Sequence, residues 1–171
     1  MKKFLILVVL GLLMSSSIFA GQEHKFGIGI GGGTFATGLS GKYNMSKGTA
    51  LQGILGARGS YGFSLGLDFI VNMPPDLLRN RDVELSWYAG AGGSIWHYSH
   101  TAGGYDYSWN TIAVSGVVGL SLMLQKVPLE FSLEWRPSFY ISGDDGKNDG
   151  FNSGYSGIEL FELGANIRWF F

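Results

Sequence analysis

The sequence predicts an all-β protein, an eight-stranded antiparallel up-and-down transmembrane β-barrel of the bacterial outer membrane. Three observations predict it. The N-terminal segment has the layout of an export signal, eight later segments alternate large apolar residues with polar or small ones, and the last segment ends on an aromatic residue. Alternation with a period of two gives a strand one apolar face, which a membrane barrel turns towards lipid.

Residues 1–20 have the features of a secretory signal peptide. Lys2 and Lys3 supply the positive charge, residues 4–14 the apolar stretch, and Ala20 the small residue before the cleavage site. A membrane anchor is the weaker alternative, because a spanning helix needs about 20 apolar residues. We therefore expect residues 1–20 to be removed and residues 21–171 to form one barrel domain.

The composition excludes several classes of protein. The chain has no cysteine, so disulfides, thiol chemistry and the acylated cysteine of a lipoprotein are excluded. Without Lys2 and Lys3 the 12 basic residues fall to 10 against 13 acidic ones, which argues against nucleic-acid binding. Charged residues make up 15% of the chain, below the roughly 25% of soluble domains.

The first four alternating segments are 26–31, 39–45, 51–58 and 61–73. The first alternates isoleucine with glycine, and the next two alternate apolar residues with Ser, Lys, Gln and Arg, although Ile54 falls on the polar side. The fourth carries seven apolar residues on one parity, against Gly, Ser and Asp on the other. Each segment has the two-faced pattern of a strand.

The last four segments are 83–95, 111–124, 129–141 and 161–171. All four are long enough to cross a bilayer, since a tilted strand needs about 9–11 residues. We expect tight turns at 46–48 and 125–128 and long polar loops at 97–110 and 142–157. With a periplasmic N-terminus, these long loops lie outside the cell, as in outer-membrane barrels. Residues 74–82 are long for a periplasmic turn.

Charged residues of the strands share the parity of glycine and serine. A soluble barrel, the main alternative, would instead carry charges outside and its large apolar side chains within. Charges inside a narrow lumen must be paired, and eight strands leave an interior that side chains just fill. We therefore predict a filled lumen held by a network of Lys42, Arg58, Asp68, Glu84, Glu130, Glu134, Arg136, Glu162 and Arg168.

Aromatic residues cluster near the predicted strand ends, as in the girdles of membrane barrels. We expect one girdle on the periplasmic side and one on the outer side. The first comprises Trp87, Phe131, Trp169 and Phe171, and the second Tyr61, Phe63 and Phe139.

The C-terminal segment resembles the assembly signal of outer-membrane barrels. A polar residue, Glu162, precedes Gly164 by two positions, Ile167 and Trp169 follow, and Phe171 ends the sequence. The resemblance implies that the last strand is recognised by the barrel-assembly machinery of the outer membrane.

Two further segments, 37–43 and 127–137, resemble those of small outer-membrane barrel families. The predicted architecture is similar to the membrane domains of OmpA-type and OmpX-type proteins. The resemblance implies a monomer surrounded by outer-membrane lipid and lipopolysaccharide. It carries almost no information on activity.

His97 and Ser99 give the sharpest enzymatic alternative. They share the parity of Ile95, so both would face lipid near the outer rim, where a histidine can activate a serine hydroxyl. The pair resembles that of outer-membrane lipid A deacylases, which also use an acidic residue. Here the pair lies on the fifth strand, and Asp106 is the sole acidic candidate in the adjoining loop.

We therefore expect a non-enzymatic barrel that serves envelope structure or surface contact through its outer loops. A lipid A hydrolase at the outer leaflet and a narrow channel are the alternatives. We expect no cofactor and no metal site. The acidic loop 144–150 could attract a divalent cation, but Lys147 occupies a ligand position, and Gly31–Gly33 precede no helix that would make a phosphate loop.

Overall fold

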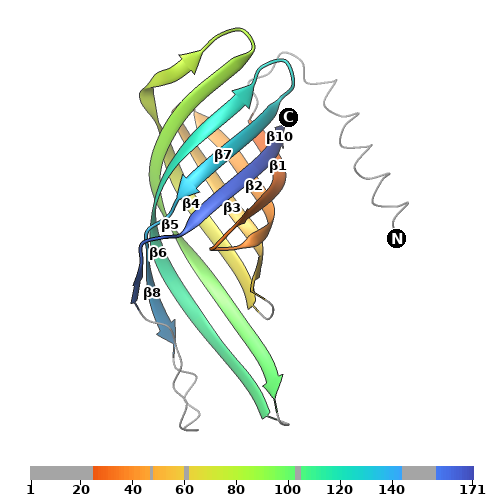
Figure 1. The fold of residues 1–171 in the computed structure, drawn as a ribbon, viewed down its shortest axis with the longest axis vertical. Coiled ribbons are helices and arrows are strands. Elements are labelled where there is room, and N and C mark those ends of the chain that lie inside the picture. The colour runs from red at the N-terminus through yellow and green to blue at the C-terminus, as the bar shows by residue number, and fades with distance from the viewer. Residues whose placement is uncertain (1–24, 47, 60–61, 103–104, 144–156) are drawn as a thin grey trace, which may run out of the picture.

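The computed structural model describes residues 25–46, 48–59, 62–102, 105–143 and 157–171, so the predicted signal peptide lies outside the described part. These residues are all-β, in ten strands (Figure 1). The strands are β1 (Phe26–Gly33), β2 (Thr37–Ser46), β3 (Thr49–Arg58), β4 (Gly62–Arg79), β5 (Val83–Ala102), β6 (Tyr105–Leu124), β7 (Leu129–Trp135), β8 (Ser138–Gly143), β9 (Gly157–Glu159) and β10 (Leu163–Phe170). No helix of the described residues is long and apolar enough to span a membrane.

Eight of the strands form a closed antiparallel ring. The ring runs β1-β2-β3-β4-β5-β6-β7-β10 and closes where β10 pairs with β1. β8 continues the path of β7 along β6 after a break at Pro137, whose ring leaves no N–H for the ladder. β9 pairs with β8 outside the ring. The predicted eight-stranded antiparallel barrel is therefore confirmed.

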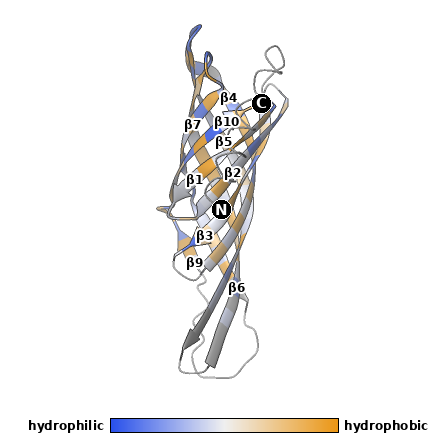
Figure 2. Cartoon of the chain, turned by 90° about the vertical axis from the view of Figure 1, so that its right-hand side faces the viewer, coloured by the Kyte–Doolittle hydropathy of each residue, from blue (hydrophilic) through white to orange (hydrophobic). Residues whose placement is uncertain are grey.

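The alternation of the sequence becomes an inner and an outer surface. Charged and small polar residues point into the barrel, where Lys42, Asp68 and Glu130 are buried. Large apolar residues point outwards, and Ile30 and Leu133 are each 64% exposed. Figure 2 shows orange segments interrupted by blue and white ones along the barrel strands. The strand registers keep this alternation in phase from one strand to the next.

The prediction of a long loop at 97–110 is wrong. The pairing of β5 with β6 continues from His97 and Asn110 to Ala102 and Tyr105, so most of the segment is a β-ribbon. In Figure 1 this green ribbon projects beyond the barrel, at the end opposite the C-terminus. A continued ladder satisfies the backbone groups that a loop would leave to solvent.

The connection at 74–82, which is long for a periplasmic turn in the sequence, is a short turn in the structure. β4 continues to Arg79 after a register shift between Met73 and Leu78, where two prolines interrupt the ladder. Asn80 then makes the turn, since its side-chain oxygen accepts the N–H groups of Asp82 and Val83 at 2.9 and 2.8 Å. Most of the other predicted loop, residues 144–156, lies outside the described part of the chain.

Candidate functional site in the barrel lumen

Among the residues that the structure describes, four cationic and four anionic side chains lie in the lumen, and their formal charges sum to zero. They come from five strands and two strand junctions that the ring brings together, and each points inwards because of its parity. The cations are Lys42, Arg58, Arg136 and Arg168, and the carboxylates are Asp68, Glu130, Glu134 and Glu162. This balance lets a narrow interior hold eight ionisable groups without an unpaired charge.

The ion pairs nearest the C-terminus converge on Glu130. Its two carboxylate oxygens bind Lys42 Nζ at 2.6 Å and Arg168 Nη1 at 2.7 Å. Arg168 also donates from Nε to the hydroxyl oxygen of Ser40 at 2.8 Å. These bonds join β2, β7 and β10 across the lumen, so they tie the two sides of the closing seam together.

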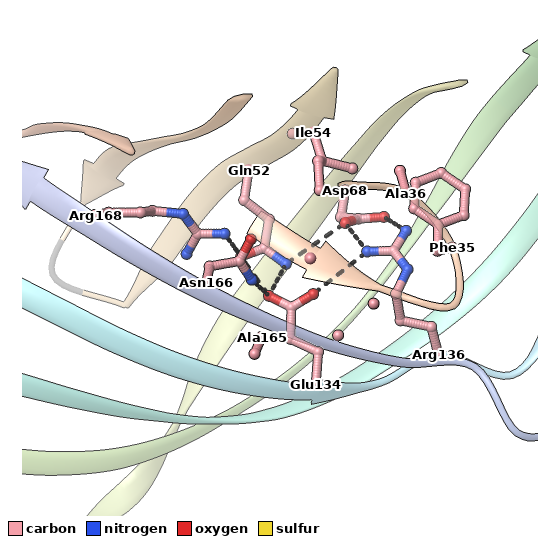
Figure 3. A pocket seen from close by; sticks show the side chains of 14 residues that line it. Phe35, Ala36, Gln52, Ile54, Asp68, Glu134, Arg136, Ala165, Asn166 and Arg168 are labelled. Atoms are coloured by element: carbon pink, nitrogen blue, oxygen red, sulfur yellow. Dashed lines mark hydrogen bonds and ion pairs between the residues drawn. The ribbon is translucent and has the colours of Figure 1, made fainter. Parts of the chain in front are cut away.

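The middle of the lumen is organised by Arg136 and Glu134 (Figure 3). Arg136 makes a two-pronged pair with Asp68, with N–O distances of 2.6 and 2.9 Å, a geometry that fits a planar guanidinium to a carboxylate. One oxygen of Glu134 accepts bonds from Gln52 at 2.9 Å, Tyr88 at 2.8 Å and Asn166 at 3.1 Å. Glu134 is therefore the most connected acceptor of the network.

A third group of contacts surrounds Arg58, towards the projecting ribbon. Arg58 lies 3.2 Å from Glu162 and donates to the Tyr140 hydroxyl at 2.6 Å. Its guanidinium carbon also lies 4.5 Å from the ring centre of Trp96 and 4.9 Å from that of Tyr140, within the range of cation–π attraction. Ser138 donates to Glu162 at 2.6 Å, so this carboxylate has several partners.

Apolar side chains close the lumen on both sides of the ion pairs. Ala50, Ile70 and Val117 are almost fully buried in one row across β3, β4 and β6, and Phe170 is fully buried near the closing seam. On the other side the turn between β1 and β2 folds inwards, and the Phe35 ring lies 4.8 Å from the guanidinium carbon of Arg136. The cavity among these groups measures about 20 Å³, room for about one water molecule.

Glu84 does not join the predicted network. It lies one residue after the start of β5, beside the turn, where it pairs with Arg79 at 3.7 Å and accepts a bond from Gln125 at 3.1 Å. Both contacts are on the partly exposed rim. The alternation pattern predicted that Glu84 points into the lumen. Glu84 lies at the end of a hairpin, where a side chain on the inner face of the strand is already at the rim and outside the lumen.

The network also contains residues that the sequence analysis missed. Tyr88 and Tyr140 are buried in the lumen, and each shares the parity of a neighbouring serine, Ser86 or Ser138, so this signal could have found them. Gln52 and Asn166 also have the parity of the charged residues on their strands, so the same signal applies to them. Phe35 had no such signal, because it lies in a turn without strand alternation.

The candidate catalytic residues lie where the ribbon of β5 and β6 leaves the barrel. His97 and Ser99 lie two residues apart in β5, and both are exposed. The Nδ1 atom of His97 lies 2.8 Å from the side-chain oxygen of Asn110. Asp106 lies in β6, with its backbone paired to Thr101 and its side chain outside the described part.

The predicted assembly signal lies at the closing seam. Gly164, Ile167 and Trp169 belong to β10, which pairs with β1 on one side and β7 on the other. Phe171 follows the strand, and its N–H donates to the carbonyl of Phe26 at 2.8 Å. Of the predicted girdle residues, Phe63, Phe131 and Phe139 are exposed; Tyr61 lies outside the described residues.

No three His, Cys, Asp or Glu side chains of the described residues are arranged to hold a metal ion. The acidic segment 144–150 lies outside that part. Comparisons with known proteins find no match: no protein-family model fits the sequence, and no curated protein or solved structure is recognisably similar.

Proposed function

We propose that this protein is an integral outer-membrane barrel with a sealed lumen, which serves envelope structure or surface contact without catalysing a reaction. The supporting observation is the inverted distribution of its residues. Glu130 is 1% and Arg168 2% exposed, whereas Ile30 and Leu133 are each 64% exposed. A water-soluble barrel has the opposite arrangement, because apolar surface is removed from water and charge remains in it.

The apolar exterior extends over most strands of the ring. Exposed large apolar residues occur on every strand of the ring and also on β8 and β9. Soluble monomers rarely expose contiguous apolar patches above a few hundred Å², whereas a bilayer solvates such a surface. The closed ring also has no free strand edge around its circumference, which is the condition for strands in lipid.

Surface contact would be made by the ribbon of β5 and β6. The last pairing of β4 with β5 is at Tyr98, and the last pairing of β8 with β6 is at Asn110. Beyond these two residues neither edge of the ribbon pairs with another described strand. A projecting ribbon with two open edges can accept an added strand from a partner.

A lipid A hydrolase is the enzymatic alternative, and the contact of His97 favours the non-enzymatic barrel. The partner of His97 is an amide, which cannot supply the negative charge that a carboxylate supplies to a catalytic histidine. We expect Ser99→Ala to leave the lipid A of intact cells unchanged, as measured by mass spectrometry. Loss of a deacylated species in the variant would show that the barrel is an enzyme.

The proposal is tested with the full chain expressed in bacterial cells. We expect it in the outer-membrane fraction, extractable only by detergent, with a gel mobility that changes on heating because the closed barrel resists denaturation. A cysteine placed at Ser99 should react with a membrane-impermeant maleimide on intact cells. Recovery of the folded protein in the soluble fraction would overturn the proposal.

A further inference from the structure

We propose that the inner face of the projecting ribbon binds neutral saccharide chains of the glycolipid that surrounds the barrel in the outer leaflet. The ribbon consists of residues 97–110, and its inner face is the side that continues the lumen-facing side of β5 and β6. This inference rests on the proposed outer-membrane location and names a ligand for the ribbon. The ligand lies on a face of the ribbon, so the two open edges stay free for an added strand.

The two faces of β5 and β6 exchange their character where the ribbon begins. Within the barrel the outward positions are mostly apolar, and the last of them, Ile95 and Ile112, are 52% and 56% exposed. Beyond this pair the outward positions are polar, and the side chains described there are exposed: His97, Ser99, Ser108 and Asn110. The apolar outer surface therefore ends at Ile95 and Ile112, which puts the projecting ribbon outside the hydrocarbon layer of a membrane (Figure 1).

Aromatic residues occupy the inner face of the ribbon. The register places six residues on this face in three cross-strand pairs, which are Tyr98 with Trp109, His100 with Tyr107 and Ala102 with Tyr105. Five of the six carry aromatic rings, and none has a large aliphatic side chain. Neighbouring strands lie about 4.8 Å apart, and successive positions on one face of a strand about 6.7 Å apart. These residues therefore form one continuous patch that is large enough for more than one sugar ring.

The lower end of the inner face is packed against the mouth of the lumen. The rings of Trp96 and Tyr98 meet edge to face, with their centres 6.5 Å apart and their planes at 85°. The guanidinium carbon of Arg58 lies 4.5 Å from the ring centre of Trp96, and Arg58 pairs with Glu162 at 3.2 Å. The first rings are therefore supported by the barrel, and the cation beneath them is already paired.

The residue types of the inner face fit a saccharide. Tyrosine and tryptophan present apolar ring faces and carry a hydroxyl or an N–H at the ring edge. A sugar ring has the same division, since its faces carry C–H groups and its edge carries hydroxyls. The two kinds of ring can therefore stack while their polar edges exchange hydrogen bonds. An acyl chain would leave those edges without partners, which is costly for a buried polar group.

The inner face also matches a ligand without charge. Residues 96–110 contain no lysine or arginine, and their one acidic residue, Asp106, pairs with Thr101 on the outer face. A nucleic acid needs basic residues for its phosphates, and an acidic peptide needs a positive surface as well. The outer saccharide chains of lipopolysaccharide are rich in hydroxyls and fill the layer into which the ribbon projects. The ligand therefore fits the inner face by its position as well as by its chemistry.

The test uses the full chain refolded in phospholipid nanodiscs. The probe is the lipid-free polysaccharide that mild acid releases from smooth lipopolysaccharide, in a titration followed by tryptophan fluorescence and by calorimetry. We expect saturable binding by the wild type. Heparin, an anionic polysaccharide, should bind about tenfold more weakly or less, since the inner face has no lysine or arginine. Equal binding of heparin would show that ring stacking does not select the ligand and would overturn the proposal.

Trp109→Ala removes one ring from the inner face and should weaken binding about tenfold, which is about 1.4 kcal/mol. Ser108→Ala is the matched control, because Ser108 is the adjacent residue on the outer face and is exposed; its affinity should stay within about twofold of the wild type. An Asn-Gly turn in place of residues 100–107 removes two of the three pairs and should abolish saturable binding. The heat-dependent gel mobility verifies that each variant is folded. Unchanged binding by Trp109→Ala would overturn the site.

Other occupants of the inner face would give different results. Binding that appears only after residues 145–155 are replaced by a Gly-Ser linker would show that this segment of the chain covers the face. Wild-type dimers that Trp109→Ala abolishes would show that a second copy covers it. Either result would overturn the saccharide site.

The outcomes also separate this inference from the proposed function. A barrel that is recovered in the outer-membrane fraction but binds no polysaccharide overturns the saccharide site alone. A protein recovered in the soluble fraction overturns the proposed function, and the inference falls with it because its ligand belongs to the outer leaflet.

Discussion

At the scale of the residue, the lumen shows how eight charges can be buried in a narrow barrel. Each charge has an opposite partner within 3.2 Å, apart from Glu134, whose cationic neighbours lie at 3.5 and 3.8 Å. Glu134 instead accepts three bonds from uncharged donors. Its removal would therefore leave amide and hydroxyl donors unsatisfied as well as weaken the charge balance.

We expect Glu134→Ala to lower the free energy of unfolding by about 3–5 kcal/mol, the usual cost of removing one partner from a buried charge network. Urea unfolding of the refolded barrel, followed by heat-dependent gel mobility and tryptophan fluorescence, measures the effect. Glu84→Ala is the control, with an expected loss under about 1 kcal/mol because its ion pair lies on the exposed rim. Equal effects of the two substitutions would contradict the assignment of Glu134 to the network.

At the scale of the element, the barrel wall has different heights on its two sides. β1 ends at Gly33 and the chain turns inwards at Phe35, whereas β5 and β6 each contain 20 residues and continue past the mouth. The short side supplies a plug for the lumen and the tall side supplies a ribbon. The same antiparallel pairing produces both, and only the positions of the turns differ.

The ribbon beyond Ser99 should be dispensable for folding. We expect a variant in which an Asn-Gly turn replaces residues 100–107 to keep the heat-dependent gel mobility of the wild type. Ser99 pairs with Ser108, so a two-residue turn can close the hairpin there. The removed residues pair with no strand other than each other. A variant that no longer forms the compact barrel would show that the ribbon contributes to folding.

At the scale of the whole molecule, the lumen is filled by charged and apolar side chains together. Phe35 lies against Arg136 among the ion pairs, and Ala50, Ile70 and Val117 form a separate apolar row. A cavity of about 20 Å³ remains.

We expect no steady conductance from the wild-type barrel in planar bilayers. Phe35→Ala should also remain closed, because the apolar row and Phe170 do not depend on Phe35. The recording uses an open porin as the positive control, and the heat-dependent gel mobility of each sample verifies that it is folded. Stable single-channel steps from the wild type would favour the narrow channel over the sealed barrel.

The local pattern of the sequence was sufficient for the architecture. The number of strands in the ring, the side of each strand that faces inwards and the position of the charged face all follow from period-two alternation, which is a property of neighbouring residues. Ile54 was noted as an exception on the polar parity, and it indeed lines the cavity within the lumen. The loop at 97–110 was predicted wrongly because polar residues can pair in a β-ribbon as readily as they form a loop.

The pairing within the lumen was decided by the tertiary structure alone. Lys42 and Glu130 are 88 residues apart, and Arg136 and Asp68 are 68 apart. Such partners meet only after the ring closes and the register of every intervening strand is set, which no local pattern specifies. For the same reason the sequence does not show that Phe35 lies over Arg136. The sequence determined which faces the strands present, because alternation is local, and the closed ring determined which residues meet.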